Sequence, residues 1–175
     1  MALSKIPTDL VSGTLASSQL PAQLSISSSA SSGSLAVDSA GRVTMPYQPY
    51  FVAYRNTSVW ESYSNQVVVW TSTQHNVGNH FSTSTGAFTA PVAGVYFFDS
   101  LIYQLNTLTY GYNFIRVNGS TNTRLRFSIV NENGASDFTN NLTVVLKLSA
   151  NDTVDVQVNG DLYTGHSHFS GYLIG

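Results

Sequence analysis

The sequence predicts an all-β fold: a sandwich, jelly roll or barrel of about ten short strands, preceded by an extended N-terminal arm. Two observations predict the strands. From residue 50 onward, short segments rich in β-branched and aromatic residues follow one another, and each ends in Asn, Gly, Ser or Thr. No window of twelve residues in this part shows helical periodicity. Many short strands at this spacing are typical of two-layered or closed β structures.

The first part of the chain differs in composition, which predicts the arm. Residues 1–34 are rich in Ser, Ala and Leu, and the low-complexity run LSISSSASSGS within them cannot bury a face of its own. A short hairpin is expected next, because residues 35–37 and 43–45 flank turn-forming residues. We therefore divide the chain into an arm with this hairpin, residues 1–47, and a head, residues 48–175.

The head begins with the predicted strand 51–55 and ends with the predicted strand 168–175. In 153–160 Val occupies positions 154, 156 and 158, and in 123–130 Leu, Phe and Ile occupy positions 125, 127 and 129, so each strand has one apolar face for the core. The remaining predicted strands are 66–72, 94–105, 110–119 and 142–149.

The stretch TGAFTAPVAGVYFF, residues 85–98, has the pattern of a strand, a tight corner formed by a proline and a glycine, and a second strand. In the second strand Tyr96 and Phe98 share one face, while Val95 and Phe97 share the other. Only one face of a strand in a sandwich looks into the core. The second apolar face therefore needs a partner, and a copy of the same protein is the most economical one.

The same stretch lies inside a longer aromatic motif. The residues that form the motif are Trp70, Asn76, Phe81, Phe88, Gly94, Tyr96 and Phe98. Their spacing resembles the signature of the complement C1q globular-head family, a jelly roll of the tumour necrosis factor (TNF)-like superfamily. The chain departs from that signature at Trp70, where the family has Phe, and at Ser100, where the family has Phe or Tyr.

The tail of the chain is similar to the same family, both in the hairpin sequence 141–158 and in the closing strand FSGYLI, residues 169–174. The resemblance covers about residues 50–175. It implies a C1q-like jelly roll that forms a homotrimer through aromatic residues. The residues expected in the core or at the trimer interface are Tyr96, Phe98, Phe88, Phe169 and Tyr172.

The arm suggests a setting for the head. We find neither a collagen-like Gly-X-Y run nor a secretion signal in the sequence, which argues against a secreted protein of the complement type. The opening MALSKIP, the Ser-rich run and SAGRVTMPYQPYF instead resemble the openings of structural proteins in tailed phages, particularly marine and cyanobacterial ones.

We therefore predict a homotrimeric fibre or appendage of a phage virion, assembled in the host cytoplasm and exposed on the particle. The arm is expected to bind other virion proteins, and the head to adhere to a glycan or receptor on the host surface. One alternative is a capsid decoration protein of the same particle. An alternative of another class is a secreted C1q/TNF-like ligand or lectin.

Composition excludes several classes of function. Only 9% of residues are charged, against about 25% in an ordinary soluble domain, so the surface consists of uncharged hydrogen-bonding side chains. The net charge is −2 and the cations are scattered, so nucleic acid is not expected as a ligand. Cysteine is absent, which excludes thiolate chemistry. No apolar run approaches the roughly 20 residues that cross a bilayer, so membrane insertion is not expected.

Catalysis is not expected either. A Ser-His-Asp triad can be drawn from His75 or His80 with Asp99, Asp137 or Asp155, but any Ser-rich chain permits such a drawing and no Gly-x-Ser-x-Gly elbow accompanies it. A carboxylate pair for glycoside cleavage lacks support, because both Glu residues, Glu61 and Glu132, fall in expected loops. The chain is therefore predicted not to be an enzyme.

Three features offer ligands for metals or sugars. His166 and His168 would point to one face of a strand, where three such pairs in a trimer would surround one iron ion; a polar strand entry explains them equally. Residues 131–137, NENGASD, offer oxygen ligands for calcium or a polar hairpin loop. Since each metal candidate has an equally good structural explanation, no cofactor is predicted. Tyrosines on these strands can stack on sugars if they are exposed; otherwise they belong to the core or to the trimer interface. The candidates are Tyr103, Tyr110 and Tyr112.

Overall fold

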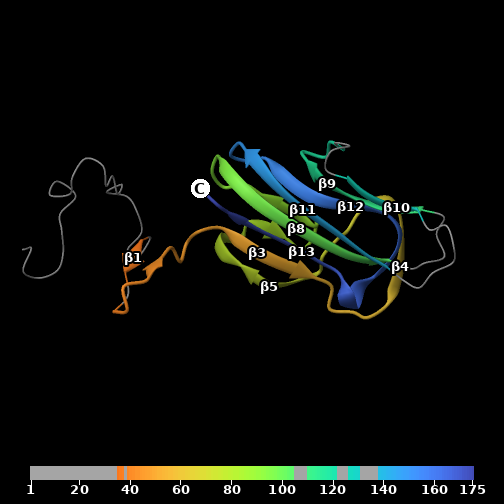
Figure 1. The fold of residues 1–175 in the computed structure, drawn as a ribbon, viewed down its shortest axis with the longest axis horizontal. Coiled ribbons are helices and arrows are strands. Elements are labelled where there is room, and N and C mark those ends of the chain that lie inside the picture. The colour runs from red at the N-terminus through yellow and green to blue at the C-terminus, as the bar shows by residue number, and fades with distance from the viewer. Residues whose placement is uncertain (1–34, 38, 105–109, 122–125, 131–137) are drawn as a thin grey trace, which may run out of the picture. The chain divides into compact units, whose positions relative to one another are not determined.

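The computed structural model describes residues 35–37, 39–104, 110–121, 126–130 and 138–175 (Figure 1). The chain divides into two units between Pro46 and Tyr47. In the first unit β1 (Ala36–Val37) and β2 (Val43–Thr44) pair as an antiparallel hairpin, which agrees with the sequence pattern there. Residues 1–34, most of the predicted arm, lie outside the described residues.

The second unit is the head, and the all-β prediction for it is confirmed. Two short 3-10 turns, η3 (Val77–Asn79) and η5 (Thr164–His166), interrupt the strands. In the described part of the chain no helix is long and apolar enough to cross a membrane. The strands of the head are β3 (Tyr50–Tyr54), β4 (Trp60–Val67), β5 (Ser72–Asn76), β6 (Phe81–Ser82), β7 (Ala87–Thr89), β8 (Gly94–Gln104), β9 (Tyr110–Val117), β10 (Arg126–Val130), β11 (Phe138–Leu148), β12 (Thr153–Tyr163) and β13 (His168–Leu173).

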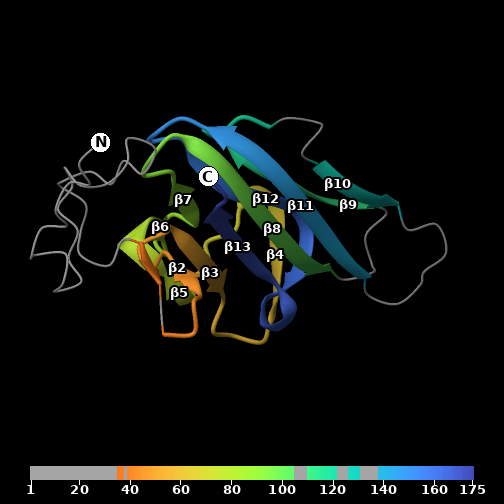
Figure 2. The ribbon, with the colours of Figure 1, turned by 60° about the vertical axis from the view of Figure 1, so that its left-hand side comes forward.

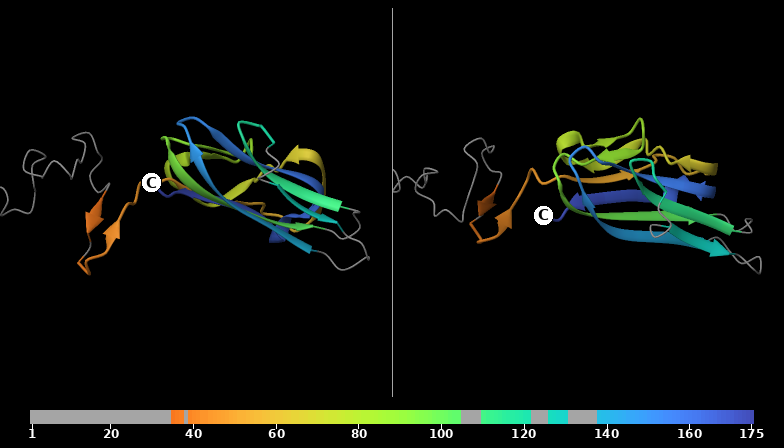
Figure 3. Two further views of the ribbon diagram at one scale, coloured as in Figure 1. Left: turned by 45° about the horizontal axis from the view of Figure 1, so that its top comes forward. Right: turned by 90° about the horizontal axis from the view of Figure 1, so that it is seen from above.

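The strands form two layers. The first layer has the order β5-β3-β13-β8-β11, and Figures 1 and 2 show its strands side by side. In the second layer β12 pairs with β9, which pairs with β10, while the other edge of β12 carries β7 and then β4. All these pairs are antiparallel, and only the Leu162–Gln104 bridge links β12 directly to β8 among the described pairs. Figure 3 shows the C-terminus at the end of the head where β3 enters.

The core between the layers is built from aromatic rings. Phe51 lies 5.1 Å from Phe88 and 5.0 Å from Phe169, measured between ring centroids, and Phe88 lies 5.6 Å from Phe98. All four side chains are fully buried. Burying one side chain of this size stabilises a fold by roughly 1.5–3 kcal/mol, so these rings hold the two layers together.

Two predicted strands differ from the structure. The expected strand 66–72 is wrong in its bounds, because β4 ends at Val67 and β5 begins at Ser72. Between them Val68 and Trp70 are buried, and the Val68 amide donates to the Val156 carbonyl at 2.9 Å. The apolar run fills the core while the chain passes from one layer to the other. Of the expected strand 123–130, β10 contains 126–130, and the preceding residues lie outside the described part.

Candidate functional site

An apolar row crosses the outward face of the first layer. We define it as Val145 on β11, Phe97 on β8, Tyr172 on β13 and Tyr50 on β3, which stand opposite one another in the register of the sheet. The Phe97 and Tyr172 rings stack with centroids 5.0 Å apart. Val145 is 61% exposed, Tyr172 46% and Tyr50 39%. Exposed apolar patches of sufficient size are typical of association surfaces on soluble proteins.

A polar group lies beside the apolar row on the same face. The Thr143 hydroxyl donates to Asp99 Oδ1 at 2.8 Å, and His168 Nε2 lies 3.3 Å from Asp99 Oδ2. Ser170 stands opposite Asp99 in the register. The carboxylate of Asp99 is therefore held by neighbours in its own sheet. A partner that covers this face would not need to supply hydrogen bonds to this carboxylate.

An aromatic cluster lies at the other end of β8. It consists of Trp60, Tyr103, Tyr163 and His166, with Trp60 5.1 Å from Tyr163 and His166 4.9 Å from Tyr163 between ring centroids. Tyr103 lies 5.8 Å from Trp60 and 5.1 Å from His166. Tyr103 and Phe97 are six residues apart on one strand face, a separation of about 20 Å at 3.3 Å per residue. The cluster is thus distinct from the apolar row.

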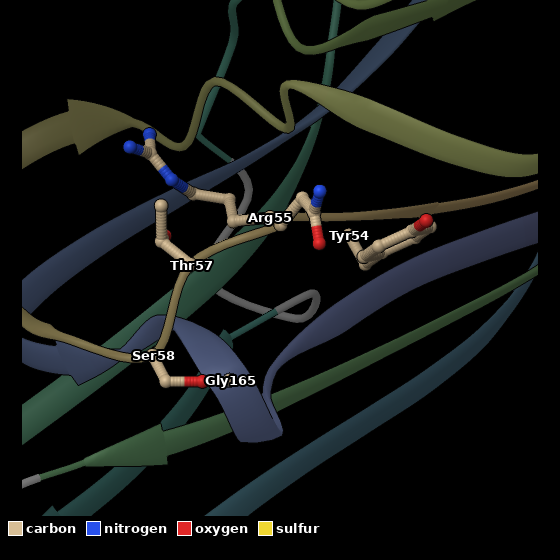
Figure 4. A pocket seen from close by; sticks show the side chains of 6 residues that line it. Tyr54, Arg55, Thr57, Ser58 and Gly165 are labelled. Atoms are coloured by element: carbon tan, nitrogen blue, oxygen red, sulfur yellow. The ribbon is translucent and has the colours of Figure 1, made fainter.

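Figure 4 shows residues that line a polar hollow of about 430 Å³. A Cβ placed on Gly165 would lie 2.8 Å from the Ser58 hydroxyl and 3.1 Å from the Tyr163 ring, so the hollow and the cluster meet at this glycine. Figure 4 shows the Ser58 side chain directed toward Gly165. The residues that line the hollow are Tyr54, Arg55, Asn56, Thr57, Ser58 and Gly165.

The one cation in the lining of the hollow is neutralised. Arg55 Nη2 donates to Glu61 Oε1 at 2.6 Å, and Nη1 donates to the Val69 carbonyl at 3.0 Å. The Tyr63 hydroxyl donates to Glu61 Oε2 at 2.8 Å. Burial, reinforced by this bond to a carboxylate, raises the pKa of Tyr63 to about 12. The hollow therefore presents a nearly neutral surface.

The residues predicted for core or trimer interface occupy two different places. Tyr96, Phe98, Phe88 and Phe169 are buried within one chain, at 0–1% exposure, and Tyr96 donates its hydroxyl to the Val92 carbonyl at 2.8 Å. Burial raises the pKa of the Tyr96 hydroxyl. These four are therefore core residues of the protomer, whereas Tyr172 lies on the outward face in the apolar row.

The proposed metal pair has other partners. His166 belongs to η5 and not to a strand, so the strand geometry expected for a His-x-His pair is wrong. Its ring packs on Tyr103 and Tyr163, while His168 faces Asp99. No group of three or more His, Cys, Asp or Glu side chains suited to a metal ion occurs in the described part of one chain. The calcium candidate, residues 131–137, lies outside it.

The residues considered for a triad do not come together. His75 packs beside Tyr50, with ring centroids 5.5 Å apart, and His80 packs edge-on against Phe88. Asp155 forms a two-bonded ion pair with Arg116, at 2.6 and 2.9 Å. Asp137 and Glu132 lie outside the described residues. Contrary to expectation, Glu61 lies in a strand, β4, where Arg55 and Tyr63 bind it.

Of the tyrosines considered for stacking, Tyr103 belongs to the aromatic cluster. The Tyr112 hydroxyl donates to Asn65 Oδ1, and the guanidinium of Arg126 lies 4.4 Å from the centroid of the Tyr112 ring. The side chain of Tyr110 lies outside the described part. Sequence reasoning did not find Trp60, Val145 or Tyr50 as surface residues, because a single aromatic or Val in a strand carries no sign of which face it occupies.

Comparisons with known proteins agree with this geometry. The C1q domain family model matches residues 50–174. The mouse and human proteins named complement C1q tumor necrosis factor-related protein 3 are 35% identical to the chain over 117 residues, which is 65% of this chain and 46% of each relative. The chain thus spans about half the length of these curated relatives.

Solved structures share the fold. The globular domain of the zebrafish complement 1qA protein has a TM-score of 0.60 at 20% identity, and the match covers 73% of this chain and 98% of that one. The Eiger TNF from S. frugiperda has a TM-score of 0.57 at 17% identity, over 73% of this chain and 93% of that one. The predicted C1q/TNF-like jelly roll is confirmed.

The same findings correct the predicted setting. The curated relatives are mammalian proteins of complement type and not phage proteins. The prediction of a phage virion protein, as fibre or as capsid decoration, and of a virion location is therefore wrong. The resemblance of the arm misled because a Ser-rich low-complexity segment carries little information about ancestry. The prediction that the chain is not an enzyme is confirmed, since C1q/TNF-like domains are non-enzymatic ligands.

Proposed function

The chain belongs to the C1q domain family, and from this premise we propose that it is an extracellular ligand of C1q/TNF type whose head assembles as a homotrimer through the apolar row. The observation that carries the proposal is the row itself. Its three exposed members leave an apolar band open to water in a single chain, although the core beneath is complete without it. Exposing apolar side chains to water is unfavourable, and burying the band against a second copy removes this free-energy cost.

Two further facts support the proposal. Relatives with the C1q/TNF fold are homotrimeric, which supports self-association of this chain. The surface relies on uncharged hydrogen-bonding groups, with 9% charged residues in the whole chain, a composition that suits a head exposed outside cells. Three heads in one assembly bind a surface more tightly than one, because the second and third contacts form at high effective concentration.

The test is the mass of the full-length protein in solution, measured by light scattering. The wild type is expected at three times the 18.9 kDa of one chain. Val145→Asp is expected to dissociate it at micromolar concentration, because a carboxylate placed in a dry interface loses its hydration without gaining a partner. Val92→Asp is the matched control, since Val92 is 48% exposed in the turn before β8, outside the apolar row.

A monomeric wild type contradicts the trimer. A Val145→Asp variant that keeps the wild-type mass, with a second substitution in the row, Phe97→Asp, giving the same result, contradicts the assignment of the interface to this face. Equal dissociation by Val92→Asp would mean that any added charge disperses the assembly, and the apolar row would then have no special role.

A further inference from the structure

Trp60 presents an aromatic surface that the fold does not cover. Its ring rests on Tyr103 and Tyr163, and His166 completes the cluster from η5, yet Trp60 remains 39% exposed. The supporting rings fix the indole in place, so it is a rigid platform and not a loose side chain. A rigid, partly exposed Trp is typical of surfaces that bind ligands with an apolar face and a polar edge.

The hollow beside this platform offers unused hydrogen-bonding groups. The side chains of Asn56 and Ser58 are exposed, and neither forms a hydrogen bond with another described residue. The Thr57 hydroxyl, by contrast, bonds to Thr164 at 3.0 Å, which holds the 55–59 segment against η5. Since Val59 also donates its amide to Thr164 Oγ1 at 3.1 Å, the polar groups of the hollow stand on a fixed backbone.

The chemistry of the two parts defines the ligand. We propose that the aromatic cluster and the polar hollow together form a saccharide-binding site, in which a neutral pyranose ring lies on Trp60 and its hydroxyls bond to Ser58 and Asn56. The C–H groups on one face of a pyranose carry small positive charges that suit the negative face of an aromatic ring. Its hydroxyls both donate and accept, as do Ser and Asn side chains.

Charge and size favour this ligand over others. An anionic ligand such as a phosphate needs an available cation, whereas the charge of Arg55 is balanced by Glu61, its Nη1 donates to the Val69 carbonyl, and its remaining donor, Nε, is buried. The volume of about 430 Å³ lies within the roughly 300–1,000 Å³ of small-molecule sites, which is room for a mono- or disaccharide. Gly165 joins the two parts by close contact, because a Cβ there would lie only 2.8 Å from the Ser58 hydroxyl of the hollow and 3.1 Å from the Tyr163 ring of the cluster.

The inference deepens the proposed function, since it gives the chemical class of a partner for the extracellular head. It depends on the trimer only for avidity: three sites, one on each protomer, would turn a weak contact into a firm one on a glycan-covered surface. The site is built from residues of one chain, so a single protomer is expected to bind the sugar with its intrinsic affinity.

The experiment uses the full chain on an array of immobilised neutral and acidic glycans, followed by calorimetric titration with the soluble glycan that binds best. Trp60→Ala is expected to weaken binding by at least about tenfold, the loss typical of removing one stacking ring. Ser58→Ala is expected to weaken it by about three- to tenfold, as for one hydrogen bond. Tyr47→Ala is the matched control, because Tyr47 is 59% exposed and lies outside the site.

The outcomes separate this inference from the trimer. If Val145→Asp is monomeric but binds the soluble glycan with wild-type affinity, the site belongs to one chain, as inferred. If the wild type binds no glycan on the array, or if Trp60→Ala and Ser58→Ala both bind as tightly as Tyr47→Ala, the inference is overturned, whatever the mass measurement gives. If only acidic glycans bind, the assignment to neutral sugars is overturned.

Discussion

At Gly171 in β13, the addition of a single methyl group is expected to lower the stability of the core strongly. A Cβ at this residue would lie 2.5 Å from Phe98 Cδ1, 2.8 Å from Phe98 Cε1 and 2.9 Å from Phe51 Cε1. Carbon atoms in contact ordinarily lie about 3.5–4.0 Å apart, so each ring would have to retreat by roughly 1 Å. Neither ring has that freedom, because Phe98 is bounded by Phe88, at 5.6 Å between centroids, and Phe51 is bounded by Phe81, at 4.7 Å.

We expect Gly171→Ala to lower the free energy of unfolding by about 2–3 kcal/mol, the upper part of the range for overpacked cores. For a head of this size that corresponds to a fall in Tm of about 10 °C. The assay is urea unfolding followed by tryptophan fluorescence, to which the buried Trp70 and the partly exposed Trp60 both contribute, at one fixed protomer concentration because any assembly would add stability. Gly175→Ala is the control, since a Cβ at Gly175 meets nothing within 4 Å. A loss below about 0.5 kcal/mol for Gly171→Ala would refute the argument that the rings are immobile.

Two further predictions concern hydrogen-bonded side chains that are partly or largely buried in the head. The folded-state pKa of Tyr63, about 12, lies above its ordinary value of 10.0, so its contribution to stability is complete below pH 10 and is lost as the pH rises toward 12. Urea midpoints measured across that window should fall less steeply in Tyr63→Phe, and parallel falls in both proteins would contradict this. The ion pair of Arg116 and Asp155 is only 14% and 11% exposed, so Asp155→Asn should cost about 2–3 kcal/mol by leaving the guanidinium unpaired. The control on the same strand, Asp161→Asn, should cost less than about 0.5 kcal/mol, because its partner is a surface serine, Ser62. Equal losses of stability in the two variants would contradict the larger contribution expected of the buried ion pair.

The aromatic motif was the most informative part of the sequence. Phe88, Tyr96 and Phe98 lie in the core as the strand pattern requires, and Val154, Val156 and Val158 are fully buried as their alternation predicts. Such residues are predictable because a period of two places every second side chain on one face. The same reasoning placed Phe97 on the face opposite Phe98 and predicted that one of the two apolar faces needs a cover outside the core, but it did not say which face.

Other parts of the fold could not be predicted because they depend on distant pairing. The sequence of β4, WESYSNQV, has no apolar alternation, and it is a strand only because β12 pairs with it across almost a hundred residues. The core also contains polar side chains that no pattern indicates. Ser100, at the position where the C1q signature has an aromatic residue, is fully buried, as are Gln104 and Asn140, which bond to each other. Buried amides and hydroxyls of this kind are usually completed by ordered water.

The two faces of β8 allow the core and the proposed trimer interface to be tested separately. Phe98 points into the core and is fully buried, while its neighbour Phe97 points outward and belongs to the apolar row. Because the faces alternate, Gly171→Ala acts on Phe98 and should lower the unfolding midpoint of each protomer. Val145→Asp acts opposite Phe97, so it should lower the mass of the assembly and leave the core intact. If Val145→Asp also lowered the midpoint at dilutions where the wild type is monomeric, the apolar row would be part of the protomer's own core, and no trimer would be needed to explain it.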